Sequence, residues 1–256
     1  MTVHDVINSL WHLAPEHLRE DWDNVGLMVG RGDADVSRVL VALDATETVA
    51  EEAERLGCEL VVTHHPLIFH GVKSVTDEAA DGRRILAFLE RGIAVISMHT
   101  NLDCAPGGVN DVLAAALGLH NISILDDGET AGLVRMGEAP VQALPEFAGF
   151  VKTKLNCPGI RYADGGKQVC HVAVGGGACG DYIERVAAAG CDTFVTADLK
   201  YHQFADAKTI GINLIDAGHF ETEDPVCAAL VSYLQSEFPA LHVQKSAVHA
   251  DCICYL

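Results

Sequence analysis

Apolar and polar positions alternate along the chain in a way that predicts helices and strands in turn. Apolar residues at helical spacing predict a helix over 3–13, and short apolar runs predict buried strands. The first half is predicted to contain strands at 38–45, 58–63 and 93–98, with helices at 46–57, 81–92 and 107–119. Such alternation indicates a largely parallel α/β sheet.

The second half returns to this pattern after a different middle segment. Residues 121–168 suggest short strands around a helix at about 142–155, including a strand-like stretch at 130–137. Strands are then expected at 168–174, 191–196 and 211–216, with helices at 178–190 and 223–238.

The two halves also resemble each other in sequence. Residues 51–65 align with 181–198, so that Gly57-Cys58 matches Gly190-Cys191 and Thr63 matches Thr196. Residues 92–100 align in the same way with 211–219. This self-similarity predicts a duplicated α/β unit, with repeats at 1–125 and 126–256. Open α/β sheets bind ligands at the carboxyl ends of their strands, and both repeats carry polar residues there.

Five of these residues are of the types that bind metals. His64 and His65 end the strand at 58–63, Asp103 follows the strand at 93–98, and His219 and Glu223 open a helix four residues apart. Imidazole and carboxylate bind zinc, iron or manganese. Adjacent side chains in extended backbone point to opposite faces, so His64 and His65 are expected to hold different ions. Five such ligands suit a pair of ions better than one four-coordinate site.

Each residue alone has a plainer interpretation. A histidine at a strand end is usually a satisfied surface or core residue. Asp103 lies in a stretch rich in turn formers, and Glu223 suits a helix start because the helix dipole favours a carboxylate there. The metal prediction therefore depends on all five lying at comparable strand ends of a duplicated fold.

Composition narrows the classes of function. The formal net charge of −19, without a compensating basic cluster, disfavours nucleic-acid binding. No apolar run is long enough for a membrane helix, and the N-terminus lacks the features of a signal peptide, so we expect a cytoplasmic protein. The nine cysteines form no CxxC pair, so neither a disulfide framework nor a cysteine-based zinc site is expected.

Several longer motifs resemble one family: the GTP cyclohydrolase I type 2 homologues, also called the NGG-interacting-factor-three-like or dinuclear-metal-centre proteins. The motifs are "EDWDNVGLMVG" (20–30), "VLVALDAT" (39–46), "VVTHHPLIF" (61–69), "HTNLDCAPGGVND" (99–111), "TADLKYH" (196–202) and "DAGHFETE" (216–223). They run in order along the whole chain, which is similar to the short form without an inserted domain. One departure is Ala197, where the family usually has glycine.

The resemblance implies two intertwined, duplicated α/β repeats with mixed, mainly parallel sheets, assembled into a homohexamer. Its metal ligands would be the same five residues, His64, His65, Asp103, His219 and Glu223, holding two divalent ions with Glu223 as the bridge. The implied activity is hydrolysis of a nucleotide or another phosphorylated small molecule. His99 and His202 lie near the ligand motifs as candidates for the catalytic acid or base, or as supports for the ligands.

Two other functions stay open on the sequence. A metal-binding hexamer without catalysis, acting as a scaffold or regulator, would carry the same ligands. A dinucleotide-binding oxidoreductase is suggested by Gly175, Gly177 and Gly180, which fit G-x-G-x-x-G after a strand, with Asp198 ending the next strand. The same glycines also suit a plain tight turn.

Overall fold

The structure is a computed structural model that describes residues 1–126 and 132–256. It divides into two compact units, one formed by 1–106 and 227–250 and the other by 107–226 and 251–256. The chain thus begins in the first unit, forms most of the second, returns to complete the first, and ends in the second. The repeats predicted from the sequence are 1–125 and 126–256. The two units are instead defined by which residues pack together in the structure. No helix within the described residues is long and apolar enough to cross a membrane.

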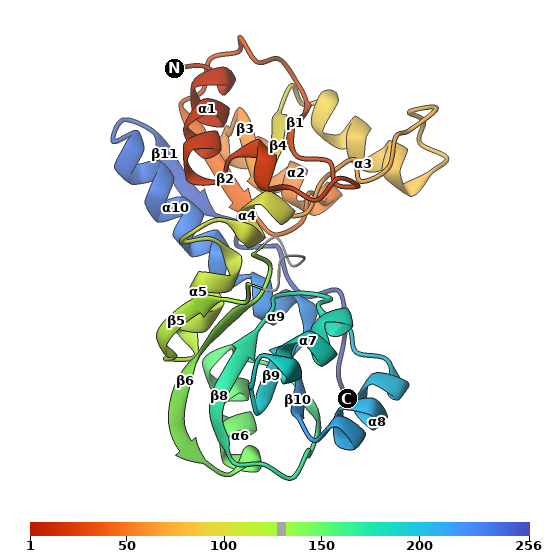
Figure 1. Ribbon diagram of the computed structural model, residues 1–256. Coiled ribbons are helices and arrows are strands. Elements are labelled where there is room, and N and C mark those ends of the chain that lie inside the picture. The colour runs from red at the N-terminus through yellow and green to blue at the C-terminus, as the bar shows by residue number, and fades with distance from the viewer. Residues whose placement is uncertain (127–131) are drawn as a thin grey trace. The chain divides into compact units, whose positions relative to one another are not determined.

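The first unit is built on a five-stranded sheet in the order β1-β4-β3-β2-β11 (Figure 1). Its strands are β1 (Gly26–Val29), β2 (Arg38–Ala42), β3 (Leu60–Thr63), β4 (Ala94–Ser97) and β11 (His242–Lys245). All neighbours pair in parallel except β1, which runs antiparallel to β4. The carboxyl ends of β2, β3 and β4 therefore lie at one edge of the sheet.

Helices bury both faces of this sheet. The helices and short turns are α1 (Val3–Leu13), η1 (Glu16–Leu18), α2 (Glu47–Leu56), α3 (Ala80–Leu89), α4 (Thr100–Cys104) and α10 (Pro225–Glu237). Residues of α2 and α3 share one core with Leu40, Val61 and Val95. Val39 and Val41 point to the opposite face and are fully buried, so that face is covered as well. The Tyr233 hydroxyl of α10 donates to the Ser9 carbonyl of α1 at 2.8 Å.

The second unit holds a six-stranded sheet in the order β5-β6-β8-β9-β10-β7. Its strands are β5 (His120–Ile124), β6 (Arg135–Gln142), β7 (Arg161–Ala163), β8 (Val169–Val174), β9 (Thr193–Thr196) and β10 (Asn213–Asp216). β8, β9 and β10 are parallel at the centre, and the other pairs are antiparallel. Both sheets are therefore mixed, as the resemblance to the family implies. The predicted strand at 130–137 lies partly outside the described residues.

Two layers of helices cover the second sheet. The helices are α5 (Val109–Ala116), α6 (Leu144–Lys154), η2 (Gly180–Tyr182), α7 (Ile183–Ala188), α8 (Tyr201–Ile210) and α9 (His219–Glu223). α5 and α6 pack with Val172, Val174 and Val195, while α7 and α8 pack with Ala173 and Phe194. Because neighbours along a strand face opposite ways, these two cores lie on opposite faces.

Candidate metal centre

Three imidazoles gather at the carboxyl edge of the first sheet. His64 and His65 follow β3, and His99 follows β4. One ligand nitrogen from each of the three lies within 4.8 Å of the others. Asp103 on α4 adds a carboxylate, with its Oδ1 3.6 Å from His64 Nε2. The first unit thus brings together three of the five predicted ligands and one of the two predicted acid–base candidates.

The expected separation of His64 and His65 onto opposite faces is wrong. Their ring centroids lie 5.0 Å apart at an interplanar angle of 45°. Side chains alternate between faces only within a strand, and β3 ends at Thr63, before the two histidines. The backbone bends at His64 and His65, although the His65 amide still donates to the Leu43 carbonyl next to the end of β2, at 2.9 Å.

The second unit carries an imidazole and a carboxylate on the short helix α9. His219 and Glu223 lie one turn apart, and His219 Nε2 is 3.1 Å from Glu223 Oε2. Glu223 is buried, with an exposed fraction of 4%, while His219 is half-buried. The spacing of four residues therefore does place both side chains on one face of a helix.

The four imidazoles share one arrangement that the sequence did not identify. In each, Nδ1 lies 2.7–2.8 Å from an oxygen: the Met98 carbonyl for His64, Asp44 for His65, Asp23 for His99, and Asp198 for His219. A carbonyl or an ionised carboxylate only accepts, so Nδ1 donates its hydrogen in every case. If these histidines bind a metal, Nε2 would be the coordinating atom, as is usual for metal-binding histidines whose Nδ1 donates to an oxygen.

Carboxylates set the electrostatics of both clusters. Burial alone would lower the pKa of His219, but the hydrogen bonds and charges of Asp198 and Glu223 outweigh it and raise the pKa to about 11. Burial likewise raises the pKa of Asp23, yet hydrogen bonds from His99 and Thr100 reverse this and lower it to about 2. Each cluster is thus a negative environment that favours a cation, and a divalent ion can take the place of the proton on a ring nitrogen.

The glycine-rich loop before η2, which contains Gly176 and Gly177, packs against His219 and Glu223 of the second unit. The Gly176 amide donates to Asn110 Oδ1 at 2.7 Å, and the Gly177 amide donates to Thr222 Oγ1 at 3.0 Å. A Cβ on Gly177, whose φ is +62°, would lie 2.2 Å from Glu223 Oε1. These amides bind side chains of the unit itself.

The dinucleotide interpretation therefore loses both of its supports. The loop that it assigns to a pyrophosphate packs against α9. Asp198, which it assigns to a ribose, accepts from His219. Asp198 has φ of +55°, a left-handed conformation that aspartate tolerates better than most residues.

The remaining predicted residue, His202, is placed separately. It is exposed at the second position of α8. The structure gives it a location on the surface of the second unit and leaves its predicted catalytic role a hypothesis.

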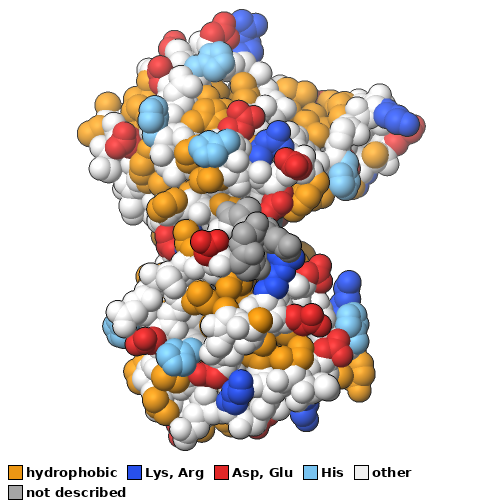
Figure 2. Space-filling model, in the orientation of Figure 1, with side chains coloured by type: hydrophobic (Ala, Val, Ile, Leu, Met, Phe, Trp, Pro, Cys, Tyr) orange, Lys and Arg blue, Asp and Glu red, His pale blue; other side chains and the backbone are white. Residues whose placement is uncertain are grey.

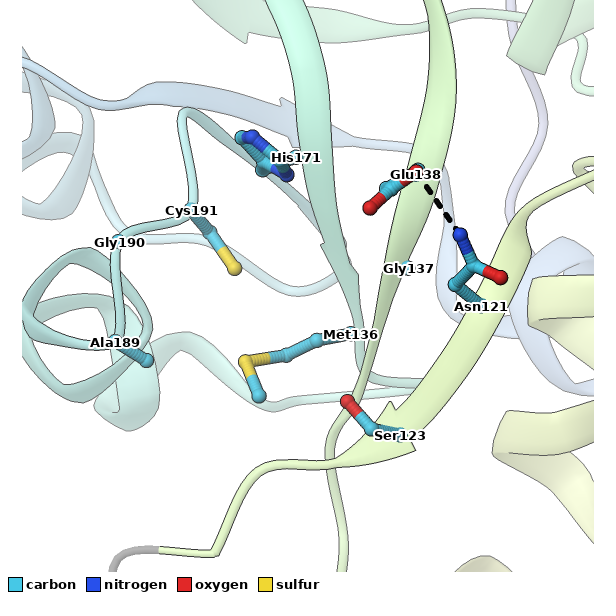
Figure 3. A pocket seen from close by; sticks show the side chains of 9 residues that line it. All are labelled: Asn121, Ser123, Met136, Gly137, Glu138, His171, Ala189, Gly190 and Cys191. Atoms are coloured by element: carbon cyan, nitrogen blue, oxygen red, sulfur yellow. Dashed lines mark hydrogen bonds between the residues drawn. The ribbon is translucent and has the colours of Figure 1, made fainter.

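A cavity of about 320 Å³ in the second unit holds none of the predicted site residues (Figure 3). It lies over β5, β6 and β8, with Met136, Glu138 and His171 among its lining residues. Two of the lining residues bind each other, since the Asn121 side-chain amide donates to Glu138 Oε2 at 3.1 Å. The metal-type clusters described above are thus separate from this cavity.

The fold and the paired clusters define an α/β protein with imidazole–carboxylate sites of the kind that binds metals. A family model described as Duf34/NIF3 (NGG1p interacting factor 3) matches residues 1–252, and the chain belongs to that family. A Clostridium perfringens protein named GTP cyclohydrolase 1 type 2 homolog is 37% identical over 232 residues, covering 88% of each chain.

Solved structures give the same result. A Staphylococcus aureus protein matches with a TM-score of 0.92 and 32% identity, covering 100% of this chain and 99% of that one. A Bacillus cereus protein described as related to NIF3 matches with a TM-score of 0.93 and 27% identity over the same shares. These likenesses confirm the family and the fold that the motifs predict.

Proposed function

We propose that this protein is a metal-dependent hydrolase with two divalent ions per subunit. His64, His65 and Asp103 of the first unit and His219 and Glu223 of the second would be the ligands, with Glu223 as the bridge. The observation that carries the proposal is the shared orientation of the imidazoles, each with Nδ1 held by an oxygen, so that Nε2 would be the coordinating atom. Mixed nitrogen and oxygen ligands suit zinc, iron or manganese.

When bound, such a pair of ions supplies Lewis acidity and a water of lowered pKa. The chain supplies the surrounding groups. His99 belongs to the imidazole cluster with His64 and His65, and its Nδ1 lies 2.7 Å from Asp23 Oδ1. Its Nε2 would then be the atom that gives or takes a proton. His202 is the second candidate for this role.

The substrate class we propose is a nucleotide or another phosphorylated small molecule. Relatives carry the name GTP cyclohydrolase 1 type 2 homolog, which points to a purine nucleotide. The net charge of −19 opposes long-range attraction of such an anion. On the face drawn in Figure 2 the Lys and Arg side chains of the described residues are scattered and do not form a basic patch that would attract a phosphate. Binding would therefore depend on contacts within the site.

The test combines metal analysis with a substrate panel. Protein reconstituted with zinc, iron or manganese should hold close to two ions per subunit. It should release formate or phosphate from GTP or from another nucleotide or phosphoester of the panel. His65→Ala and Asp103→Ala should abolish that release, while His12→Ala, which alters an exposed imidazole on α1, should not. Two bound ions with no turnover on any panel member would instead support a non-catalytic scaffold.

We also propose that the protein assembles into a homohexamer. In support, the edge strand β5 is exposed along its whole length, and Ile122 and Ile124 on it are 41% and 46% exposed. An exposed apolar edge strand readily pairs with another chain. Light scattering should give a mass of six subunits, and Ile124→Lys should reduce it while Ile210→Lys on α8 should not. A monomer at all concentrations would contradict the proposal.

A further inference from the structure

Two large aromatic side chains of the first unit are exposed beside each other. Trp22 and Phe69 are 59% and 41% exposed, and their ring centroids lie 5.8 Å apart at an interplanar angle of 53°. A tryptophan this exposed is uncommon, because its ring contributes a large apolar area when buried. The pair therefore needs an explanation beyond core packing.

The loops that carry the two rings are held in place by hydrogen bonds. The Asn24 side-chain amide donates to the Ile68 carbonyl at 2.6 Å, which ties the Trp22 loop to the Phe69 loop. The Asp23 carboxylate accepts from the Thr100 amide at 3.0 Å, which ties the first loop to the start of α4. The backbone next to both rings is thus held by hydrogen bonds, and a site on a held backbone has a lower entropic cost of binding.

Both rings also contact the imidazole cluster. His99 lies edge-on to Trp22 at a centroid distance of 6.1 Å and edge-on to Phe69 at 6.0 Å. The same histidine lies in the group of three imidazoles with His64 and His65. The exposed aromatic pair is therefore adjacent to the candidate metal centre.

We propose that Trp22 and Phe69 form a subsite for the planar heteroaromatic ring of the substrate, such as a nucleobase. This inference rests on the proposed function, since it assigns part of the substrate to the same site. Aromatic side chains stack on any base, because every base has a π-face. The net charge of −19 disfavours binding of a phosphate, and stacking on the two rings would offset this for a ligand with a planar base. A phosphorylated aliphatic compound has no such ring and would gain no affinity from stacking.

Fluorescence isolates the signal of one ring. The chain has two tryptophans, Trp11 and Trp22, so Trp11→Phe leaves Trp22 as the sole indole. Metal-reconstituted Trp11→Phe protein is titrated with guanosine 5′-monophosphate and, separately, with ribose 5-phosphate. Saturable quenching by the nucleotide, and none by the sugar phosphate, is the expected result. Equal responses to the two compounds would overturn the subsite.

Substitutions then test the ring contacts by calorimetric titration with guanosine 5′-monophosphate. Phe69→Ala and Trp22→Ala should each weaken binding about ten-fold, within the range for loss of one base-stacking aromatic. Phe69→Tyr keeps a ring and should bind like the parent. Val75→Ala, a change in an exposed apolar residue of the same loop, should also leave the affinity unchanged. Unchanged affinity in both alanine variants would contradict the proposal.

Two further measurements on the same samples separate the outcomes. Elemental analysis showing two ions, with no preference for the nucleotide over ribose 5-phosphate, overturns the subsite and leaves the metal centre. Ring-dependent nucleotide binding without bound metal overturns the metal centre and supports the subsite. A fall in mass by light scattering in Trp22→Ala and Phe69→Ala would show that the rings form a contact between copies of the chain, and would overturn the subsite.

Discussion

The strand ends of the two units share a backbone but differ in chemistry. After β3, the Met98 amide donates to the Thr63 carbonyl at 2.8 Å, and after β9 the Ala217 amide donates to the Thr196 carbonyl at 2.9 Å. The same correspondence holds at the strand starts, where Ala94 donates to Glu59 and Asn213 to Asp192. The duplicated segments therefore keep the same hydrogen bonds between neighbouring strands.

The side chains at equivalent positions have exchanged roles. His65 follows β3 and presents an imidazole whose Nδ1 is held by Asp44. Its counterpart after β9 is Asp198, which itself holds the imidazole of His219. At this position the first repeat thus carries an imidazole, His65, and the second carries Asp198, a carboxylate that orients the imidazole of another residue, His219. A duplicated fold can keep its frame while each copy supplies a different part of the chemistry.

The largest expected effect tests whether the two halves act on the same ions. Glu223→Gln keeps the shape of the side chain but removes the charge, so it should lower occupancy at both proposed metal sites. His65→Ala should mainly weaken one site, and His12→Ala should weaken neither. Elemental analysis after reconstitution measures this. Equal losses in Glu223→Gln and His65→Ala would argue against a bridging carboxylate.

A second variant tests the glycine-rich loop of the second unit, which packs against the proposed ligands His219 and Glu223. In Gly177→Ala, the new Cβ meets Glu223 Oε1, the end of a flexible side chain that can move away from His219. Metal content should fall, with a loss of about 1–2 kcal/mol in unfolding free energy from the left-handed backbone. Gly190→Ala is the matched control, since φ is +90° there and nothing lies within 4 Å of the new Cβ. It should keep its metal.

The exchange of roles itself is tested by substituting Asp44 and Asp198, the carboxylates that accept hydrogen bonds from His65 and His219. Asp44→Asn and Asp198→Asn leave the geometry nearly intact but weaken the acceptor of Nδ1–H. Each should lower metal affinity about 10–100-fold, the usual effect of changing such a partner. Competition with a chelating dye measures the affinity, and Asp77→Asn, which changes an exposed loop carboxylate, is the charge-matched control. If only one of the two variants lost affinity, the two repeats would not orient their proposed ligands alike.

The frame of this comparison could be predicted from the sequence because it depends on local pattern. The helix at 3–13 has the predicted bounds, and the alternating strands and helices of both repeats appear where apolar periodicity places them. The predicted helix at 178–190 is shorter, with η2 before α7, because the glycine loop occupies its start. β11 was missed, since its four residues include exposed polar ones and it is recognisable only by pairing with β2.

The oriented imidazoles could not be predicted in the same way. Asp23 lies 76 residues from His99, and the contact between them exists only once η1, β1 and β4 have packed. Asp198 stood in a recognisable position after a strand, but its partner depends on where α9 begins. The one available signal was a polar residue at the end of each strand, which marks Asp44 and Asp198 without saying what they bind.

A smaller effect concerns stability in acid, and it involves Asp23, the carboxylate that accepts a hydrogen bond from His99. The folded-state pKa of Asp23 is about 2, below the ordinary 3.8. Its ionised form therefore contributes about 2 kcal/mol above pH 3.8, and that contribution is lost as the pH falls through 2. In urea unfolding of chelator-treated protein, Asp23→Asn should be less stable at pH 6, and the gap to the parent should narrow towards pH 2.5. A gap that stays constant with pH would contradict the assignment.

The smallest effect tests whether the repeats share their backbone at the junction of helix and strand. Gly57 and Gly190 both end a helix with positive φ, +68° and +90°, and each precedes the cysteine that leads into a strand. An added Cβ meets open space at Gly190 and only Arg38 Cδ at 3.9 Å at Gly57. Gly57→Ala and Gly190→Ala should therefore each lower the free energy of unfolding by about 1 kcal/mol, through backbone strain alone. Asparagine adopts this conformation more readily, so the Asn variants should lose less. Urea unfolding measures all four variants, and a loss at one glycine several times that at the other would show that the two junctions are not equivalent.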